Sequence, residues 1–507
     1  MNLKGTLEES ARRLPDKTCV TYEWERISFA EMNRRANRFA HGLRDAAGVA
    51  QGDRVGLLAK NSPAFMEALF GMLGLGATAV PINVFLAPPE VAFILNDCGV
   101  KVLVVSSDFL PMVPALREQA PGLEHIIALD GAAPGVGEGA MTRDEITAGR
   151  SDADPGVAVA PEDDAIFLYT SGTTGVPKAA MLTHANFLAN CDSCRRAVRV
   201  MPDDSFLLAL PMFHSFSLTV NVLLPVRVGC SIVLLESVRP LERLLGALVE
   251  HGPTIFAGVP ALYGAFGRAN LPPEVLGRVK LRLCISGSAP LAEATLVEFE
   301  KRFPIPLIEG YGLSEAAPVV SLNPLDGTRK VGSIGVPLPD VEVKVFDDED
   351  REVPTGEPGE LVVRGPNVMK GYYKRPDETA AALRSGWLHT GDVARMDEDG
   401  YFFILDRKKD LIISKGMNVY PREIEEVLYR HPKVAEAAVV GRKDEHMDEA
   451  PVAFVKLADG ESAGPSELVE YLKPQLAAYK IPRRIRFVSD FPRTAAGKIL
   501  KRELKAL

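Results

Sequence analysis

Short apolar runs that alternate with helix-like stretches constrain the fold of this chain more than any other feature. Arg54–Lys60 and Val100–Ser107 have the composition of buried strands, and Ala64–Gly76 between them has that of a helix. A strand, a helix and a second strand in this order are typical of parallel sheets covered by helices. The pattern therefore predicts a layered α/β fold for the first part of the chain.

Three later segments lead from an apolar strand directly into a turn rich in Gly, Ser and Thr. The strand Asp164–Thr170 leads into the sequence YTSGTTGVPKAAM (Tyr169–Met181), and Leu281–Leu291 and Pro306–Pro318 repeat the pattern. Ligands of α/β sheets bind at the carboxyl ends of strands. We therefore expect the three turns to lie in one site.

The first of these turns has the composition of a phosphate-binding loop. It is not a Walker A loop, because Pro177 stands where the second glycine belongs and Ala179 follows Lys178. Glycines allow backbone N–H groups to turn toward an anion, while hydroxyls and an ammonium group add donors and charge. The residues expected to contact phosphate are Ser171, Gly172, Thr173, Thr174, Gly175 and Lys178. Composition alone leaves a flexible surface loop as the alternative.

The pattern changes in the last third of the sequence. From Val341 onward, alternation and turns are typical of antiparallel hairpins. After the charged run DRKKD, about a hundred residues follow, which is enough for a separate domain. We predict a first domain of residues 1–407 and a second of residues 408–507, with a hinge near Lys408–Lys409.

Composition and charge narrow the class of protein. A length of 507 residues exceeds what one hydrophobic core supports, and a net charge of −9 argues against nucleic acid as a partner. The N-terminus lacks a signal peptide, and prolines interrupt the two long uncharged stretches, so no transmembrane segment is expected. Six scattered cysteines suit a reducing cytoplasm. Peripheral membrane contact is left open, as is the choice between monomer and homodimer.

Four stretches together resemble one known family. YTSGTTGVPKAA closely resembles the phosphate loop of the adenylate-forming acyl-CoA synthetase superfamily, the AMP-binding enzymes. EGYGLSEAAP, HTGDVARMDEDGYFFILDRKKDLIISKGMNVYPREIE and PRTAAGK resemble its later motifs in order and spacing, up to Lys498. The resemblance is closest to bacterial long-chain-fatty-acid–CoA ligases. It implies a large layered N-terminal domain of parallel sheets with a distorted β-barrel part, and a small, mobile α+β C-terminal domain.

The resemblance also implies a reaction. A carboxylate is a poor acyl donor because its leaving group would be oxide, so transfer to AMP supplies a better one. A carboxylic acid and ATP would give acyl-AMP and pyrophosphate, and the thiol of coenzyme A would then displace AMP. Catalysis of this kind is mostly positioning and electrostatic stabilisation. The expected cofactors are ATP, Mg²⁺ and coenzyme A as co-substrate, and all expected partners are small molecules.

Matching positions receive roles from the resemblance. Thr170 and Glu315 would help to bind Mg²⁺, which takes hard oxygen ligands. Lys498 would bridge the carboxylate and the α-phosphate, and His214 would lie near the acyl entrance. Tyr311 would stack on adenine, and Asp392 would bind the ribose hydroxyls. Besides Thr170–Gly175, Lys178 and Lys498, the expected nucleotide-binding residues are Gly287, Ser288, Ala289, Glu309, Gly310, Tyr311, Gly312, Ser314, Asp392, Ile404 and Arg407.

By the same resemblance, a second group of residues would act in the step in which the thiol of coenzyme A reacts. Lys409 matches the family's hinge position, and Gly416 resembles the glycine that lines the pantetheine channel. Lys415 and Asn418 flank that glycine. We expect a domain rotation to remove Lys498 after adenylation and to bring in the face that carries Gly416.

The apolar segment Leu210–Val226 bears on the acid. It contains no cation before Arg227, and a second carboxylate on the acid would need one, since a buried unpaired charge is costly. A medium- or long-chain fatty acid is therefore favoured. The expected acyl-pocket residues are His214, Phe216, Val259, Gly287, Gly312 and Ala317.

Alternatives to a fatty-acid ligase stay open. Lys415 replaces the small residue common before the channel glycine, and aryl-acid ligases often carry Lys there, which keeps an aromatic acid as the runner-up. An acyl-AMP ligase that loads a carrier protein is a further alternative. An esterase is disfavoured because Gly312–Ala316 lacks the second glycine of a GxSxG motif.

Overall fold

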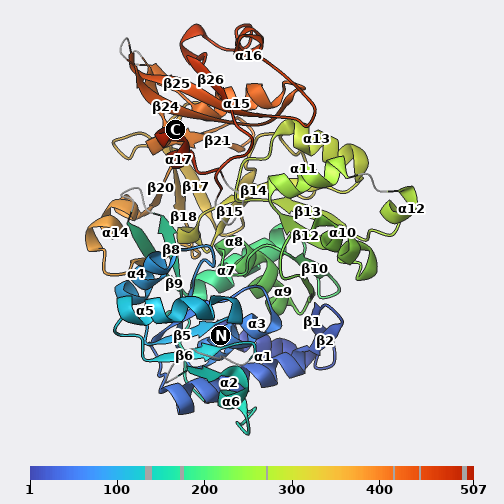
Figure 1. Cartoon of the computed structure of the whole chain (residues 1–507), viewed down its shortest axis with the longest axis vertical. Coiled ribbons are helices and arrows are strands. Elements are labelled where there is room, and N and C mark those ends of the chain that lie inside the picture. The colour runs from blue at the N-terminus through green and yellow to red at the C-terminus, as the bar shows by residue number, and fades with distance from the viewer. Residues whose placement is uncertain (132–139, 172–175, 270–271, 415–416, 445–446, 494–498) are drawn as a thin grey trace.

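The computed structural model describes residues 1–131, 140–171, 176–269, 272–414, 417–444, 447–493 and 499–507. Figure 1 shows a large lower body of sheets and helices, with the elements from α15 to α17 forming a smaller upper part. This arrangement confirms the predicted α/β class, with a large N-terminal domain of parallel sheets and a smaller C-terminal domain.

The first large sheet has eight strands. In spatial order they are β19 (Gly371–Tyr372), β9 (Pro177–Thr183), β8 (Asp164–Ser171), β4 (Thr78–Pro81), β3 (Arg54–Leu58), β5 (Val102–Val105), β6 (His125–Ala128) and β7 (Ala140–Thr142). From β8 to β7 neighbouring strands are parallel, while β9 and β19 join the edge antiparallel. The two strands predicted around Ala64–Gly76 are confirmed as β3 and β5, with α3 (Pro63–Gly74) between them.

The second large sheet has nine strands. In spatial order they are β16 (Val336–Pro337), β15 (Val319–Leu322), β14 (Leu307–Gly312), β13 (Leu283–Ser286), β12 (Ile255–Gly258), β10 (Ser205–Leu208), β11 (Ser231–Leu234), β1 (Thr18–Tyr22) and β2 (Glu25–Ser28). The six strands from β14 to β1 run parallel, and antiparallel strands close both edges. The carboxyl ends of β13 and β14 therefore lie side by side.

Helices pack against both sheets and carry the expected end signals. Ser28 and Ser62 accept hydrogen bonds from the first turns of α2 (Phe29–Ala47) and α3, and Gly48 ends α2 in the left-handed conformation. The other helices are α1 (Leu3–Arg13), α4 (Pro88–Cys98), α5 (Val113–Gln119), α6 (Arg143–Thr147), α7 (His184–Ala197), α8 (Ser215–Ser217), α9 (Leu224–Val228), α10 (Leu241–Glu250), α11 (Pro260–Arg268), α12 (Pro273–Leu276) and α13 (Glu293–Arg302).

Most of the two long uncharged stretches, Ala68–Pro89 and Phe206–Val226, is interior, although Phe85 is exposed. Every residue of α3 is buried, so this helix lies inside the core. Its single charged residue, Glu67, faces Arg35 and Arg143. The second stretch contains β10, α8, a π-helical turn (Leu218–Leu223) and α9. None of the helices in the described part of the chain combines the length and apolar character that crossing a bilayer requires.

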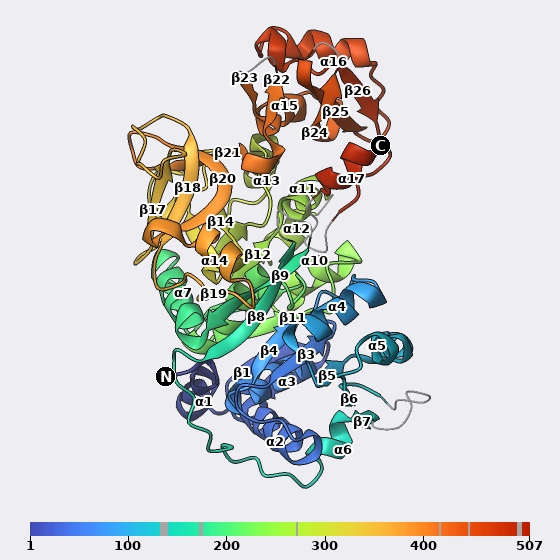
Figure 2. The same cartoon turned by 90° about the vertical axis from the view of Figure 1, so that its left-hand side faces the viewer.

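An antiparallel sheet follows the two large ones. Figure 2 shows it between the lower body and the C-terminal elements. Its strands are β17 (Glu342–Phe346), β18 (Gly359–Arg364), β20 (Leu388–Met396) and β21 (Phe402–Arg407), and α14 (Pro376–Ala382) lies in the connection before β20. This sheet occupies the part of the chain for which antiparallel hairpins were predicted.

The C-terminal elements enclose a hydrophobic cluster of their own. They are β22 (Ile412–Ser414), β23 (Met417–Val419), α15 (Pro421–Tyr429), β24 (Val434–Asp444), β25 (Met447–Leu457), α16 (Pro465–Leu472), β26 (Arg484–Phe487) and α17 (Lys501–Ala506). A 3-10 turn, Lys408–Asp410, joins them to β21. The hinge and boundary at Lys408–Lys409 fall on this turn and stay a prediction.

Candidate active site

The predicted phosphate loop joins two antiparallel strands. Thr170 lies opposite Lys178, and Ser171 lies opposite Pro177, in the register of β8 and β9. Figure 2 shows these strands extending toward the C-terminal part of the molecule. Gly172, Thr173, Thr174 and Gly175 lie outside the described residues. The strand pairing nevertheless brings the hydroxyl-bearing Thr170 and the cationic Lys178 to the same end of the hairpin.

Lys178 is a buried cation, with 7% of the residue exposed. Its Nζ lies 5.0 Å from the centroid of the Tyr372 ring, a cation–π contact. Among the residues that the structure describes, no carboxylate comes within ion-pair distance of this ammonium group. A buried ammonium group of this kind is a favourable partner for an anion such as a phosphate.

Glu315 lies directly across from the hairpin. It follows β14 in a 3-10 turn, Ser314–Ala316, and the backbone N–H of Met369 donates to its carbonyl at 2.9 Å. Its Oε1 accepts a hydrogen bond from the Tyr372 hydroxyl at 2.8 Å and one from Thr170 Oγ1 at 3.4 Å. The two residues predicted to bind Mg²⁺ are therefore in contact.

The oxygen donors of Thr170 and Glu315 fit a magnesium ion. Mg²⁺ is usually held by one or two carboxylates together with substrate phosphates and water. Within the described ranges, no group of three or more His, Cys, Asp or Glu side chains could form a metal cage. One hydroxyl and one carboxylate beside a buried cation suit a metal that arrives with a polyphosphate.

Three predicted nucleotide residues form a connected group. The Tyr311 hydroxyl donates to Asp392 Oδ2 at 2.5 Å, and Arg407 Nε lies 3.1 Å from Asp392 Oδ1. Asp392 on β20 faces Arg407 on β21 in the strand register. Burial, and then the charge of Asp392, raise the pKa of Tyr311, so its hydroxyl stays protonated and donates. Both oxygens of Asp392 thus have partners that ribose hydroxyls would have to share or replace.

The residues after β13 form the turn on the other side of Tyr311. Ser288 has a positive φ of 66°. Glu309, on β14, accepts a hydrogen bond at Oε1 from the backbone N–H of Leu291 at 3.0 Å. The turn that contains Gly287, Ser288 and Ala289 is therefore held by the strand that carries Tyr311.

Gly310 and Gly312 lie where the packing of the chain leaves no room for a side chain. A Cβ on Gly310 would lie 2.3 Å from Leu322 Cδ2, and one on Gly312 would lie 2.3 Å from the Pro318 carbonyl oxygen. Both contacts come from the close approach of β14 to β15 and the chain before it. The motif EGYG therefore needs these glycines for strand packing, whatever their part in nucleotide binding.

Burial raises the pKa of Glu309 from 4.5 to about 7. The folded chain therefore resists ionisation of this carboxyl, and stability is lost as pH rises from the unfolded pKa to the folded one. The difference in unfolding free energy between Glu309→Gln and the parent is expected to shift in favour of the variant by about 2–3 kcal/mol as pH rises from about 5 to about 8. Thermal unfolding of both proteins at the two pH values measures this gain, and a constant difference would contradict it.

His214 is a neutral side chain. Its Nδ1 accepts the backbone N–H of Phe216 at 3.3 Å, which caps α8, and burial lowers its pKa from 6.5 to about 4. Beside it, Phe213 makes an edge contact with the exposed Phe85, with ring centroids 6.4 Å apart. At neutral pH this segment therefore presents an uncharged, largely aromatic surface.

The other acyl-pocket residues lie around the same segment. A Cβ on Gly287 would come 3.1 Å from the Phe216 ring, so this ring covers the glycine closely. Thr219 Oγ1 donates to the Ala317 carbonyl oxygen at 3.0 Å, and Ser314 Oγ donates to Ser215 Oγ at 3.2 Å. Val259 is buried at the start of α11. The α8 segment thus contacts the turns after β13 and β14.

The residues expected to serve the thiol are only partly described. Lys409 lies in the turn Lys408–Asp410, and burial lowers its pKa. Asn418 is exposed on β23. Ile404, which was expected to bind the nucleotide, lies on β21, and its carbonyl oxygen accepts a hydrogen bond from an Arg422 side-chain nitrogen at 3.0 Å. Lys415, Gly416 and Lys498 lie outside the described residues.

Tyr372 is the site residue that the sequence interpretation missed. It contacts both Glu315 and Lys178, although it lies far from both in sequence. Its neighbour Arg375 binds Asp97, which also accepts the Tyr169 hydroxyl at 2.8 Å. The sequence around it, GYYKRP, was not among the motifs singled out above.

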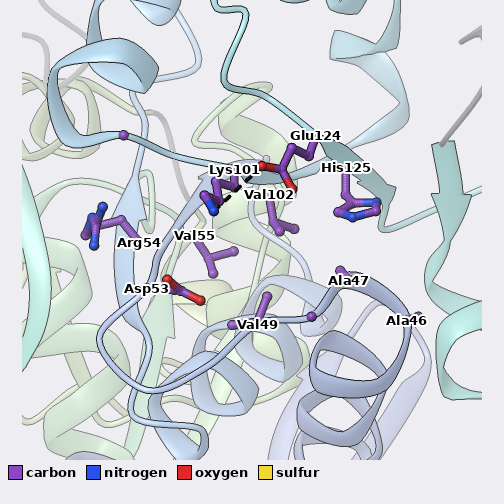
Figure 3. Close-up of a pocket in the computed structure, with 12 residues that line it drawn as sticks. Ala46, Ala47, Val49, Asp53, Arg54, Val55, Lys101, Val102, Glu124 and His125 are labelled. Atoms are coloured by element: carbon purple, nitrogen blue, oxygen red, sulfur yellow. Dashed lines mark ion pairs between the residues drawn. The ribbon is translucent and has the colours of Figure 1, made fainter.

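A separate cavity of about 240 Å³ lies at the opposite ends of the strands (Figure 3). Residues at the amino ends of β3, β5 and β6 line it, and Lys101 and Glu124 form an ion pair of 3.7 Å across it. None of the predicted site residues is among those that line it. The cavity is therefore distinct from the candidate active site.

Comparisons with known proteins agree with this geometry. Residues 7–373 match the AMP-binding enzyme family, and residues 423–498 match the AMP-binding enzyme C-terminal domain. A feruloyl-CoA synthase from Amycolatopsis sp is 38% identical, over 98% of this chain and 96% of its own. A long-chain-fatty-acid–CoA ligase from Escherichia coli O6:H1 is 36% identical, over 99% and 94%.

A solved relative contains the expected nucleotide and metal. The o-succinylbenzoate coenzyme A synthetase of Bacillus subtilis, in complex with ATP and magnesium ion, superposes with a TM-score of 0.85 and 30% sequence identity. The match covers 99% of each chain. These likenesses extend over nearly the whole sequence. The chain therefore belongs to the AMP-binding enzymes, as an acid–thiol ligase that forms an acyl-CoA through an acyl adenylate.

Proposed function

We propose that the chain activates a medium- or long-chain fatty acid with ATP and transfers the acyl group to coenzyme A. One observation carries the choice of acid. Arg227 is the first cation after the apolar segment, and it is bound at both Nε and a terminal nitrogen by Asp192, at 2.7 and 2.6 Å. It is therefore engaged and not free to neutralise a second carboxylate on the acid.

The chemistry of this function has two steps. A carboxylate oxygen of the acid attacks the α-phosphorus of ATP, and the bond to the bridging oxygen breaks to release pyrophosphate. The sulfur of coenzyme A then attacks the acyl carbon, loses its proton, and releases AMP. Bound Mg²⁺ would neutralise phosphate charge in the first step.

The described residues support the first step. Lys178 offers an ammonium group, and Thr170 with Glu315 offers oxygen ligands for a cation on the triphosphate. Asp392 and Arg407 would hold the ribose beside Tyr311. His214, uncharged at neutral pH, contributes no second charge beside the acid's carboxylate. Lys498 would bridge the acid and the α-phosphate.

An aromatic acid is the second candidate. The feruloyl-CoA synthase relative forms, by its name, feruloyl-CoA. In this chain the buried Phe216 ring lies against Gly287, which places an aromatic side chain within the expected acyl pocket. Loading of a carrier protein, in place of coenzyme A, is the third alternative. Neither the relative's name nor the contact between Phe216 and Gly287 favours it.

A release assay for AMP, run with ATP, coenzyme A and a series of acids, decides between these candidates. Each buried CH₂ contributes about 0.8 kcal/mol, so KM is expected to fall roughly fourfold per added methylene until the pocket is filled. Ferulate and benzoate are the aromatic competitors. A higher kcat/KM for ferulate than for every saturated acid would overturn the fatty-acid proposal. Acyl-AMP that accumulates in the presence of coenzyme A would favour a carrier protein.

A further inference from the structure

Tyr372 lies between the two opposite charges of the phosphate site. Its hydroxyl donates to Glu315 Oε1 at 2.8 Å, and Lys178 Nζ lies over its ring at 5.0 Å. Lys178 and Glu315 do not form an ion pair with each other in the described structure. We propose that Tyr372 is a positioning residue that keeps this cation and this carboxylate apart, so that each stays free for Mg-ATP. The inference rests on the proposed roles of Lys178 and Glu315 in nucleotide binding.

The backbone of Tyr372 is fixed from two sides. It pairs with Ala180 on β9, two residues from Lys178, and the neighbouring Tyr373 N–H donates to the Ala179 carbonyl oxygen at 2.9 Å. Its own N–H donates to Thr379 Oγ1 at 2.9 Å. Gly371 before it has a φ of 144°, and a Cβ there would lie 2.5 Å from Thr379 Cγ2. The ring of Tyr372 therefore has a defined position beside β9.

The segment after Tyr372 is also anchored. Arg375 lies 2.8 Å from Asp97 Oδ1, and the Tyr169 hydroxyl donates to Asp97 Oδ2 at 2.8 Å. Tyr169 directly precedes Thr170 on β8. One carboxylate on α4 thus ties the segment after Tyr372 to the strand that leads into the phosphate loop.

The hydroxyl of Tyr372 has a definite role in this arrangement. The Tyr372 hydroxyl is the donor in this hydrogen bond, since a carboxylate can only accept. Its hydrogen bond occupies Oε1 of Glu315 together with Thr170, which leaves Oε2 for a metal ion. Without the hydroxyl, Glu315 is free to turn toward the ammonium group of Lys178, and the resulting ion pair would compete with both parts of Mg-ATP.

The test separates the hydroxyl from the ring. Tyr372→Phe removes the hydrogen bond and keeps the cation–π contact, whereas Tyr372→Leu removes both. Tyr373→Phe is the matched control, because it is the adjacent tyrosine and its ring packs on Phe167 at 5.0 Å, away from both charges. Dissociation constants for ATP are measured by calorimetry with and without Mg²⁺, in the absence of any acid.

We expect Tyr372→Phe to weaken ATP binding by about tenfold when Mg²⁺ is present, the free energy of one hydrogen bond to a charged group. The loss should be smaller when Mg²⁺ is absent, because only the contact between Lys178 and phosphate is then disturbed. Tyr372→Leu should weaken binding in both conditions, and Tyr373→Phe in neither. In a Glu315→Gln background, Tyr372→Phe should add little further loss.

Two results would overturn the inference. One is a Tyr372→Phe protein that binds Mg-ATP as Tyr373→Phe does. The other is an equal loss with and without Mg²⁺, which would indicate a merely structural effect. A failure of the proposed function looks different, because the parent protein itself would then bind Mg-ATP but activate none of the acids in the release assay.

Discussion

Glu315→Gln is expected to lower acid-dependent exchange of labelled pyrophosphate into ATP by about 100-fold. The amide keeps the shape of the side chain and an acceptor for the Tyr372 hydroxyl at 2.8 Å, but it removes the negative charge that a cation requires. The loss therefore falls on metal and phosphate binding and leaves packing intact. Exchange rates measured across a range of Mg²⁺ concentrations should show that excess metal partly restores the variant.

The matched control is Glu293→Gln. Glu293 begins α13, and its carboxylate lies 3.7 Å from Arg430, away from the phosphate hairpin. This variant carries the same chemical change and should exchange pyrophosphate as the parent does. If Glu315→Gln also retained the parent rate at limiting Mg²⁺, the carboxylate would have no part in metal binding.

Lys498→Ala is expected to lower the same exchange by about 100- to 1,000-fold, the effect of removing a charge that stabilises the transition state. The thioester step should survive, because by the family resemblance this lysine serves only adenylation. Synthetic acyl-AMP supplied with coenzyme A tests that step directly. Replacing Gly416 with Leu should give the opposite result, with exchange preserved and thioester formation lost.

Lys505→Ala removes another lysine near the C-terminus and is the control for a loss of positive charge there. Its Nζ lies 3.8 Å from Asp410, and the side chain is exposed. It should affect neither step. Pyrophosphate exchange at the parent rate in Lys498→Ala would remove the basis for the proposed role of the tail. Equal loss of both steps in the Gly416 variant would contradict the idea that two faces of the C-terminal domain act in turn.

The sequence was sufficient for much of the fold because local patterns matched the final structure. Apolar runs that alternate with helical stretches correspond to β3, α3 and β5, and the predicted strands before the small-residue segments are β8, β13 and β14. What local patterns could not supply is the order of strands within a sheet. β1 lies beside β11, and β19 lies beside β9, through pairings between residues distant in sequence.

Only part of the candidate site could likewise be predicted from the sequence. The contacts between Thr170 and Glu315, and between Asp392 and Arg407, join residues that the motifs had already singled out. Tyr372 was missed because its importance comes from strand pairing at the sheet edge and from no motif of its own. The packing roles of Gly310 and Gly312 were also beyond the sequence, because only the approach of β15 reveals them.

The late addition of β19 to the edge of β9 has a consequence for synthesis on the ribosome. Until Gly371 and Tyr372 have left the exit tunnel, β9 exposes an unpaired strand edge, which is a template for association with other nascent chains. The same two residues bring the tyrosine to the buried ammonium group and the acidic side chain. Closing this edge of the sheet and placing Tyr372 beside Lys178 are therefore one event, and a chain that ends before Gly371 would gain neither.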